Sequence, residues 1–299
     1  MNRRNWEPEP PQQGGAVQLA ATHSDVEGLP TYQAPVPRRR PAKIRPVFYA
    51  GHQAAGKTFN VAPVLDGRRV AGSTRKDRLA TFADNVRLLV SDDLRARPDP
   101  LGLRLEIGLP NDVPLLESND LCTFLYPMVS RLTGATGRPF VSVWASKRHA
   151  RTSSVEIFQA RPGRDPGGAQ QFQVRTTASM IAPAFRRQIR KQIAGARPLP
   201  AGGVALQLSF LVGPRRVWPN LWKVVIASLG PLLGHAVDGR ELGGLAGCRV
   251  TDLGLHCVVD PAVGHDVVVA IRADTAVPRR ITLAEPTGHR TTLVQRTSA

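Results

Sequence analysis

The sequence contains no aspartate or glutamate between Asp165 and Asp238. A solvated protein surface normally carries both signs of charge interleaved, so a segment with one sign of charge is typical of a surface that binds a partner. The cations of this acid-free segment are Arg175, Arg186, Arg187, Arg190, Lys191, Arg197, Arg215, Arg216 and Lys223. We therefore expect the segment to face a polyanion.

Cysteine is scarce, and there is no long apolar run. The three cysteines, Cys122, Cys248 and Cys257, are odd in number and show no CxxC spacing, which argues against a disulfide framework or a zinc site. No N-terminal apolar stretch resembles a signal peptide, and no segment is long and uncharged enough to span a membrane. We expect a reduced, cytoplasmic protein without a membrane partner.

The composition is strongly basic. Lys and Arg outnumber Asp and Glu by 40 to 23, which gives a formal net charge of +17 over 299 residues. Such a balance favours DNA as the partner, because neutralising phosphates releases counterions. The alternative is a non-enzymatic assembly protein whose arginine content reflects the codon usage of its genome.

Two stretches about a hundred residues apart follow the same pattern. The first, at 103–134, reads LRLEIGLPNDVPLLESNDLCTFLYPMVSRLTG, and the second is the strand, basic loop and amphipathic helix at Val204–Val237. Each is preceded by ARP, at Ala96–Pro98 and Ala196–Pro198. A pattern that recurs at a fixed spacing indicates a duplicated unit. We predict an α/β (α+β) fold of two tandem similar units, each a small sheet packed with two helices.

The composition shifts along the chain predict five segments. These are a disordered arm at 1–45, a first unit at 46–160, a linker at 161–171, a second unit at 172–272 and a tail at 273–299.

Hydrophobic periodicity predicts the elements within each unit. In the first unit we expect a helix at Ser73–Leu94, a strand at Leu101–Leu109, a helix from Asn119 to Gly134, and strands at Phe140–Ala145 and Ser154–Ala160 joined by a basic turn, Ser146–Arg151. In the second we expect a strand at Phe172–Thr176, a helix at Ala182–Ala194, a strand at Val204–Val212, a helix at Asn220–Leu229, and strands at Val250–Val259 and Asp266–Ile271.

The residues Gly51, Gly56, Lys57 and Thr58 match the phosphate-loop pattern G-x-x-x-x-G-K-[ST]. This motif binds phosphate when a strand enters it and a helix leaves it, so that the helix N-terminus meets the anion. Here Pro63 follows closely and would disrupt such a helix. A P-loop NTPase acting through Gly51–Thr58 is therefore an alternative function rather than the preferred one.

The arrangement of strand, loop, helix and two further strands resembles that of RusA-type Holliday-junction resolvases. The helix of that family begins roughly D-x-D-N-x-x-K-x-x-x-D. In the first unit Asp120 falls on the first acid, Thr123 on the Asn and Tyr126 on the Lys, while Cys122 replaces the second acid. In the second unit Asn220 and Lys223 fall on the Asn and the Lys, and Val141–Ala150 is similar to the strand that ends in a Lys-aromatic turn.

The resemblance implies a fold that binds four-way DNA as a pseudo-dimer and cuts it with magnesium held by clustered aspartates. Only Asp120 keeps a family carboxylate, and Asp112 or Glu117 would have to supply a second magnesium ligand. We therefore expect a protein that binds branched or distorted DNA and has largely lost its catalytic carboxylates. The alternative is an active magnesium-dependent endodeoxyribonuclease; without that activity no cofactor is expected.

Phosphate contacts depend on lysine and arginine rather than on a metal, so DNA binding can outlast catalysis. The expected DNA-binding residues are Lys147, Arg148, Arg186, Arg187, Arg190, Lys191, Arg215, Arg216 and Lys223.

Overall fold

The computed structural model describes residues 45–51, 56–60, 74–117, 119–234 and 246–277, all within one compact unit, Lys43–Ala299. The expected arm at 1–45, except Arg45, and the expected tail from residue 278 onward lie outside the described residues.

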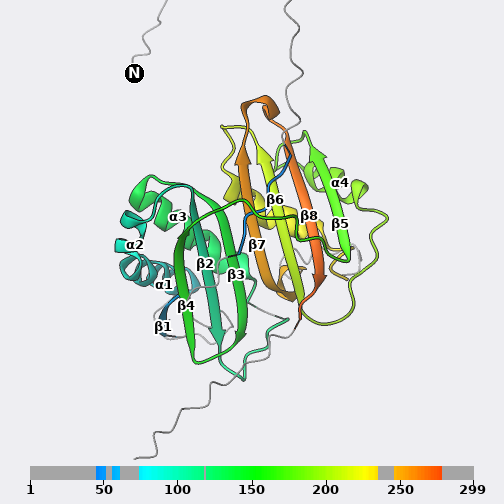
Figure 1. Cartoon of the computed structure of the whole chain (residues 1–299). Coiled ribbons are helices and arrows are strands. Elements are labelled where there is room, and N and C mark those ends of the chain that lie inside the picture. The colour runs from blue at the N-terminus through cyan, green and yellow to red at the C-terminus, as the bar shows by residue number, and fades with distance from the viewer. Residues whose placement is uncertain (1–44, 52–55, 61–73, 118, 235–245, 278–299) are drawn as a thin grey trace, which may run out of the picture. The chain divides into compact units, whose positions relative to one another are not determined.

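The fold is α+β and is built on one eight-stranded sheet (Figure 1). The strand order across the sheet is β1-β4-β2-β3-β7-β6-β8-β5. The strands are β1 (Lys57–Asn60), β2 (Leu101–Leu109), β3 (Phe140–His149), β4 (Thr152–Gln159), β5 (Gln170–Thr176), β6 (Val204–Val212), β7 (Val250–Val259) and β8 (Val267–Thr275).

The same order of pairings occurs twice in the sheet. In the N-terminal half β1 pairs antiparallel with β4, β4 antiparallel with β2, and β2 parallel with β3. In the C-terminal half β5, β8, β6 and β7 pair in the same sequence of directions. Each parallel pair has a register shift after its first residue, at Leu101 and at Val204. The expectation of two tandem copies stays a prediction, and this repeated order agrees with it.

The two halves meet where β3 pairs antiparallel with β7. Trp144 faces Gly254 at the middle of this ladder, and Ser142 faces His256. The His256 ring is fully buried and packs edge-on against Trp144, with ring centroids 5.1 Å apart. On the other face of this ladder, Val143 and Ala145 of β3 and Leu253 and Leu255 of β7 belong to one buried apolar cluster, so the two halves share a core.

The helices lie on one face of the sheet (Figure 1). They are α1 (Arg75–Leu89), α2 (Ser91–Ala96), α3 (Leu121–Thr136), α4 (Pro183–Gln192) and α5 (Leu221–Ser228), with short 3-10 turns η1 (Trp218–Asn220), η2 (Ala246–Arg249) and η3 (Pro261–Val263). Strand residues that face the helices are apolar, such as Leu103 and Leu105, whereas Arg104 and Glu106 point to the opposite face. This alternation is the period-2 signal read from the sequence.

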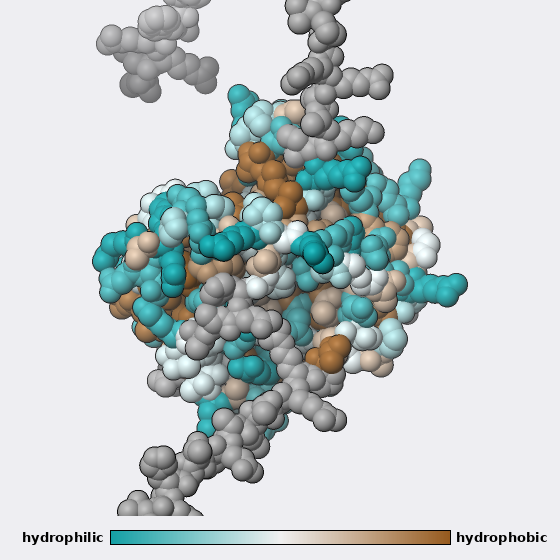
Figure 2. Space-filling view, in the orientation of Figure 1, coloured by the Kyte–Doolittle hydropathy of each residue, from teal (hydrophilic) through white to brown (hydrophobic). Residues whose placement is uncertain are grey.

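The face opposite the helices is crossed by the connection from β4 to β5 (Figure 1). This connection contacts the segment before β1, because Tyr49 bridges to Pro162 and the Ala50 amide donates to the Arg161 carbonyl at 2.9 Å. Figure 2 views this face and shows hydrophilic and hydrophobic residues interspersed on it.

In each half, one arginine donates hydrogen bonds to main-chain carbonyls of the segment before the first strand of the parallel pair, β2 or β6. Arg138 donates to the carbonyls of Leu94 and Arg97, at 2.6 and 2.7 Å. Arg249 donates to the carbonyls of Gly202 and Leu233, at 3.0 and 2.5 Å, and also to that of Pro200. Both arginines stand just before the strand that joins their half to the other, β3 or β7, where a guanidinium can bind several main-chain carbonyls at once.

Several observed elements begin or end a few residues from the expected bounds; β8, for example, runs to Thr275 rather than Ile271. Two further differences change how the elements are arranged. The helix expected at Ser73–Leu94 is interrupted at Val90, which ends α1 and precedes α2. The basic turn expected at Ser146–Arg151 is wrong, because β3 continues to His149 in register with Leu109 of β2. Only Ala150 and Arg151 remain to connect β3 with β4, so Lys147 and Arg148 are strand residues.

Candidate nucleic-acid interface

The first turns of α3 and α5 meet beside the junction of the two halves. The Tyr126 hydroxyl donates to Asn220 Oδ1 at 2.8 Å, and Lys223 Nζ donates to Thr123 Oγ1 at 3.4 Å. In the expected alignment to the RusA-type pattern, Thr123 corresponds to Asn220 and Tyr126 to Lys223. Under that alignment the two hydrogen bonds would be equivalent contacts made once in each direction. We call this region the seam, defined by Arg75, Asp120, Thr123, Tyr126, Lys147, Asn220 and Lys223.

Asp120 begins α3 and is half-buried. Its side chain accepts a hydrogen bond from the Cys122 amide at 3.0 Å, which is the usual contact of an aspartate N-cap. The preceding Asn119 has a φ of 61°, a left-handed conformation that asparagine tolerates better than most residues. Burial raises the pKa of the Asp120 carboxyl, and the Cys122 amide and nearby cations act against this rise.

Lys147 is buried on the helix-facing side of β3, with only 3% of its surface exposed. Its ammonium donates to the main-chain carbonyls of Asn119 at 3.2 Å and Cys248 at 2.5 Å. Burial lowers the pKa of Lys147 to about 8, while the Asp120 carboxylate acts in the opposite direction. A lysine in this position ties β3 to the start of α3 and to η2, and it does not reach the outer surface.

The charge around Asp120 is positive. The ionised side chains that act on its carboxyl are Lys223, Lys147 and Arg75, from α5, β3 and the start of α1. Three cations around one carboxylate leave an excess of positive charge, and this favours an anion over a divalent cation at the exposed side chains of Arg75 and Lys223. The sequence gave no signal that Arg75 lies beside Asp120, because the two are 45 positions apart.

The expected magnesium ligands Asp120, Asp112 and Glu117, all three of which the structure describes, do not form a three-ligand group. Asp112 and Glu117 are both exposed in the segment before α3. Among the residues that the structure describes, no group of three or more His, Cys, Asp or Glu side chains is placed to hold a metal ion. Magnesium prefers carboxylate oxygens and water in an octahedral arrangement. Asp120, with its cation neighbours, fits that requirement poorly.

The expected DNA-binding residues of the C-terminal half lie on α4, on α5 and between β6 and α5. Arg187 and Lys191 are exposed one turn apart on α4, and Arg186 and Arg190 form the half-buried row beside them. Arg215 is exposed after β6, while Arg216 is half-buried and donates to the His265 carbonyl. Lys223 is exposed at the seam.

Carboxylates neutralise many of the cations in the N-terminal half. Its ion pairs are Lys57–Asp93, Arg87–Asp84, Arg95–Asp92, Arg104–Glu106, Arg131–Asp84, Arg138–Asp99 and Arg148–Glu106. The described part of the C-terminal half has two arginines so paired, Arg175 with Asp266 and Arg272 with Asp165. Within the described ranges, Arg187, Lys191, Arg215 and Lys223 form no ion pair, so their charge faces solvent.

Arg148 is placed differently from the other expected contacts. It lies on β3 and pairs with Glu106 of β2 at 2.8 Å, on the face opposite the helices. Glu106 also binds Arg104 at 2.5 Å, and the two guanidiniums lower the pKa of the Glu106 carboxyl against the effect of its burial. Arg148 and the α4 cations therefore belong to different faces of the sheet.

Residues 52–55 of the phosphate-loop match lie outside the described residues, whereas Gly56, Lys57 and Thr58 at its end are described. Lys57 and Thr58 belong to β1, which pairs with β4, so a strand rather than a helix follows Gly56. Lys57 is bound to Asp93 at 2.8 Å and to the Leu89 carbonyl at 3.1 Å. The aligned amides of a helix N-terminus, on which a phosphate loop depends, are missing at this point.

Trp218 and Trp222 belong to the core rather than to the surface. Their side chains are 7% and 0% exposed and pack edge to face, with ring centroids 4.9 Å apart. None of the described helices is long and apolar enough to cross a membrane.

Comparison of the sequence with models of known protein families gives no match, and no curated protein matches it. The resemblance to RusA-type resolvases stays a prediction from the residues.

Proposed function

We propose that this protein binds DNA, preferring branched or distorted DNA, and that it does so without metal-dependent cleavage. The observation that carries the proposal is the unneutralised charge of the C-terminal half, where Arg187, Lys191, Arg215 and Lys223 form no ion pair among the described residues. Unpaired cations on a surface with few carboxylates are the electrostatic footprint of a phosphate-binding protein.

The preference for branched DNA is supported by the repeated order of strand pairing. The pairing directions repeat on either side of the β3–β7 ladder, and the reciprocal hydrogen bonds of Tyr126 and Lys223 lie beside it. Proteins with two related halves bind DNA sites whose halves are related in the same way. A four-way junction offers such related arms, whereas a straight duplex end does not.

The absence of cleavage is supported by the charge around Asp120. A metal-dependent nuclease needs two or more carboxylates to fix a cation that activates water. Apart from burial, the groups that act on the pKa of the Asp120 carboxyl are the Cys122 main-chain amide and the cations Lys223, Lys147 and Arg75. Asp120 instead caps α3 and balances the buried Lys147.

The test measures the affinity of the full chain for a fluorescently labelled four-way junction and for a linear duplex of the same arm sequence. We expect tighter binding to the junction, and affinity that falls steeply with salt. The double variant Arg187→Gln with Lys191→Gln is expected to bind both DNAs about tenfold more weakly, with a salt slope reduced by about 2.

The matched control is Arg95→Gln with Lys57→Gln, which removes the same formal charge from residues already paired with Asp92 and Asp93. It should change DNA affinity less than about twofold. Equal losses in the two variants would mean that only net charge matters, and undetectable or salt-independent binding would overturn the proposal. A magnesium-dependent cut of the junction that Asp120→Asn abolishes would replace it with the active nuclease.

A further inference from the structure

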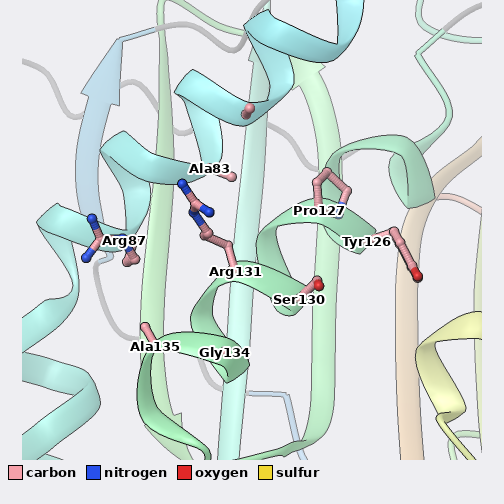
Figure 3. A pocket seen from close by; sticks show the side chains of 9 residues that line it. Ala83, Arg87, Tyr126, Pro127, Ser130, Arg131, Gly134 and Ala135 are labelled. Carbon is pink, nitrogen blue, oxygen red and sulfur yellow. The ribbon is translucent and has the colours of Figure 1, made fainter.

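A groove runs between α1 and α3 on the helix-bearing side of the N-terminal half (Figure 3). Its volume is about 670 Å³, which is within the range of ligand-binding clefts. Small residues form much of its lining, among them Ala80 and Ala83 from α1 and Gly134 from α3. A Cβ built on Gly134 would meet no atom within 4 Å, so the groove is open at this point.

The groove carries positive charge. Arg131 reaches from α3 toward α1 (Figure 3), where its Nε and Nη2 each donate to Asp84 at 2.6 Å. Arg87 lies 3.5 Å from the same carboxylate. One carboxylate thus orients two guanidiniums, and the local sum is +1. Arg131 Nη1 keeps its N–H groups for a ligand, since it has no partner among the described residues.

The groove begins at the seam. Tyr126 lines it and also donates to Asn220 of the C-terminal half, and the residue is 41% exposed. Thr123, which binds Lys223, lies on the same helix as Arg131 and ~12 Å from it along the axis. Lys223, bound at the first turn of α3, and the groove arginines Arg131 and Arg87 therefore lie along the length of α3.

We propose that this groove binds a single strand of nucleic acid that leaves a branch point held at the seam. The inference rests on the proposed function and adds to it that one strand of the bound nucleic acid is single and follows the groove between α1 and α3. The chemistry fits a single strand: Tyr126 offers a ring face on which a base can stack, and Arg131 and Arg87 offer donors to phosphate. The small residues let a strand approach the helix backbones. The axes of two packed helices lie roughly 8–10 Å apart, so the groove between them is narrower than that and cannot admit a duplex.

The experiment compares binding of the full chain to a labelled oligothymidine and to a blunt duplex, using variants that fill the groove without changing charge. Ala80→Leu and Gly134→Leu both add bulk at exposed positions that line it. Each is expected to weaken oligothymidine binding about tenfold, as loss of base stacking would, and to leave duplex binding unchanged. Unchanged circular dichroism and melting temperature would show that the variants are folded.

The matched control is Thr81→Leu, which adds a leucine on α1 at an exposed position outside the groove. It should bind both DNAs as the wild type does. If the wild type binds the junction but Ala80→Leu and Gly134→Leu bind the oligothymidine as the wild type does, the groove inference is overturned and the proposed function stays intact. Equal losses for oligothymidine and duplex would also overturn it. Binding to none of the DNAs would remove the proposed function itself.

Discussion

Lys147 and Asp120 show how a single residue changes its role once it is buried. From the sequence, Lys147 is one more cation of a basic protein. In the structure its ammonium binds two main-chain carbonyls and lies close to the Asp120 carboxylate. Burying a charge is unfavourable unless hydrogen bonds and an opposite charge compensate. The pair therefore serves the structure of the seam, and the exposed cations of the seam remain for a ligand.

This arrangement predicts a pH dependence of stability. The folded protein lowers the pKa of Lys147 from 10.5 to about 8, so between these values the unfolded chain holds more protons than the folded one. The free energy of unfolding should therefore rise as the pH rises from 8 to 10.5, by at most roughly 3 kcal/mol from this group. Urea unfolding of the wild type and of Lys147→Met between pH 7.5 and 10.5 isolates the effect.

The Met variant retains most of the side-chain volume but has no titrating amine, so its stability should lack this rise. If the free energy of unfolding changed with pH in the same way in both proteins, this would contradict the prediction that burial lowers the pKa of Lys147.

At the scale of elements, β2 shows how closely two strands can approach. Gly108 lies next to the end of this strand, and a Cβ built on it would stand 2.2 Å from the Thr152 carbonyl oxygen of β4. A main-chain atom cannot move away as a flexible side chain can. The absence of a side chain at Gly108 is thus a requirement of the pairing between β2 and β4.

Gly108→Ala should accordingly lower the free energy of unfolding by about 2 kcal/mol or more, because β4 must shift at its first residue. Gly134→Ala makes the same chemical change in the exposed interior of α3, where the added Cβ meets nothing. It should raise stability by about 0.5–1 kcal/mol, as alanine favours a helix over glycine. Chemical denaturation measures both, and a stability loss of similar size in the two variants would contradict this account.

At the scale of the molecule, the sheet passes from one half to the other without a break. The β3–β7 ladder pairs five residues of each strand, from Ser142–Ser146 with Asp252–His256. Because the two halves share one core, each half would expose apolar side chains to water if the other half were absent or unfolded. The two halves should consequently unfold together, although the repeated order of pairing suggests separable units.

We expect a single cooperative unfolding transition for the described fold. Trp218 and Trp222 lie in the C-terminal half, so the tryptophan fluorescence of a variant with Trp6→Phe and Trp144→Phe reports that half. Far-UV circular dichroism reports the helices and strands of both halves. The two signals should change at the same denaturant concentration, because neither half keeps its core when the other unfolds. Separated midpoints would contradict this prediction and would mean that the halves fold independently.

Local pattern alone predicted much of the fold. The bounds of β2, β6 and β7 follow from the alternation of Leu, Val and Ile, and α3 and α5 follow from apolar residues spaced three and four apart. These signals are local because a side chain's direction along a strand or helix depends only on its neighbours in sequence. The end of β3 was mistaken, since Lys147 and Arg148 look like a polar turn until their pairing with β2 is known.

The sequence by itself determined the strands, the helices, the acid-free segment and the residues worth testing. The tertiary structure alone decided which charges remain unneutralised, that Lys147 is buried, that Arg148 lies on the other face, and that α1 and α3 leave a groove beside the seam. Each of these depends on partners tens of positions away in the chain, such as Arg131 with Asp84 or Lys223 with Thr123. Periodicity carries no information about such pairs, because they meet only when α1 packs against α3, as for Arg131 and Asp84, or when the two halves join across β3 and β7, as for Lys223 and Thr123.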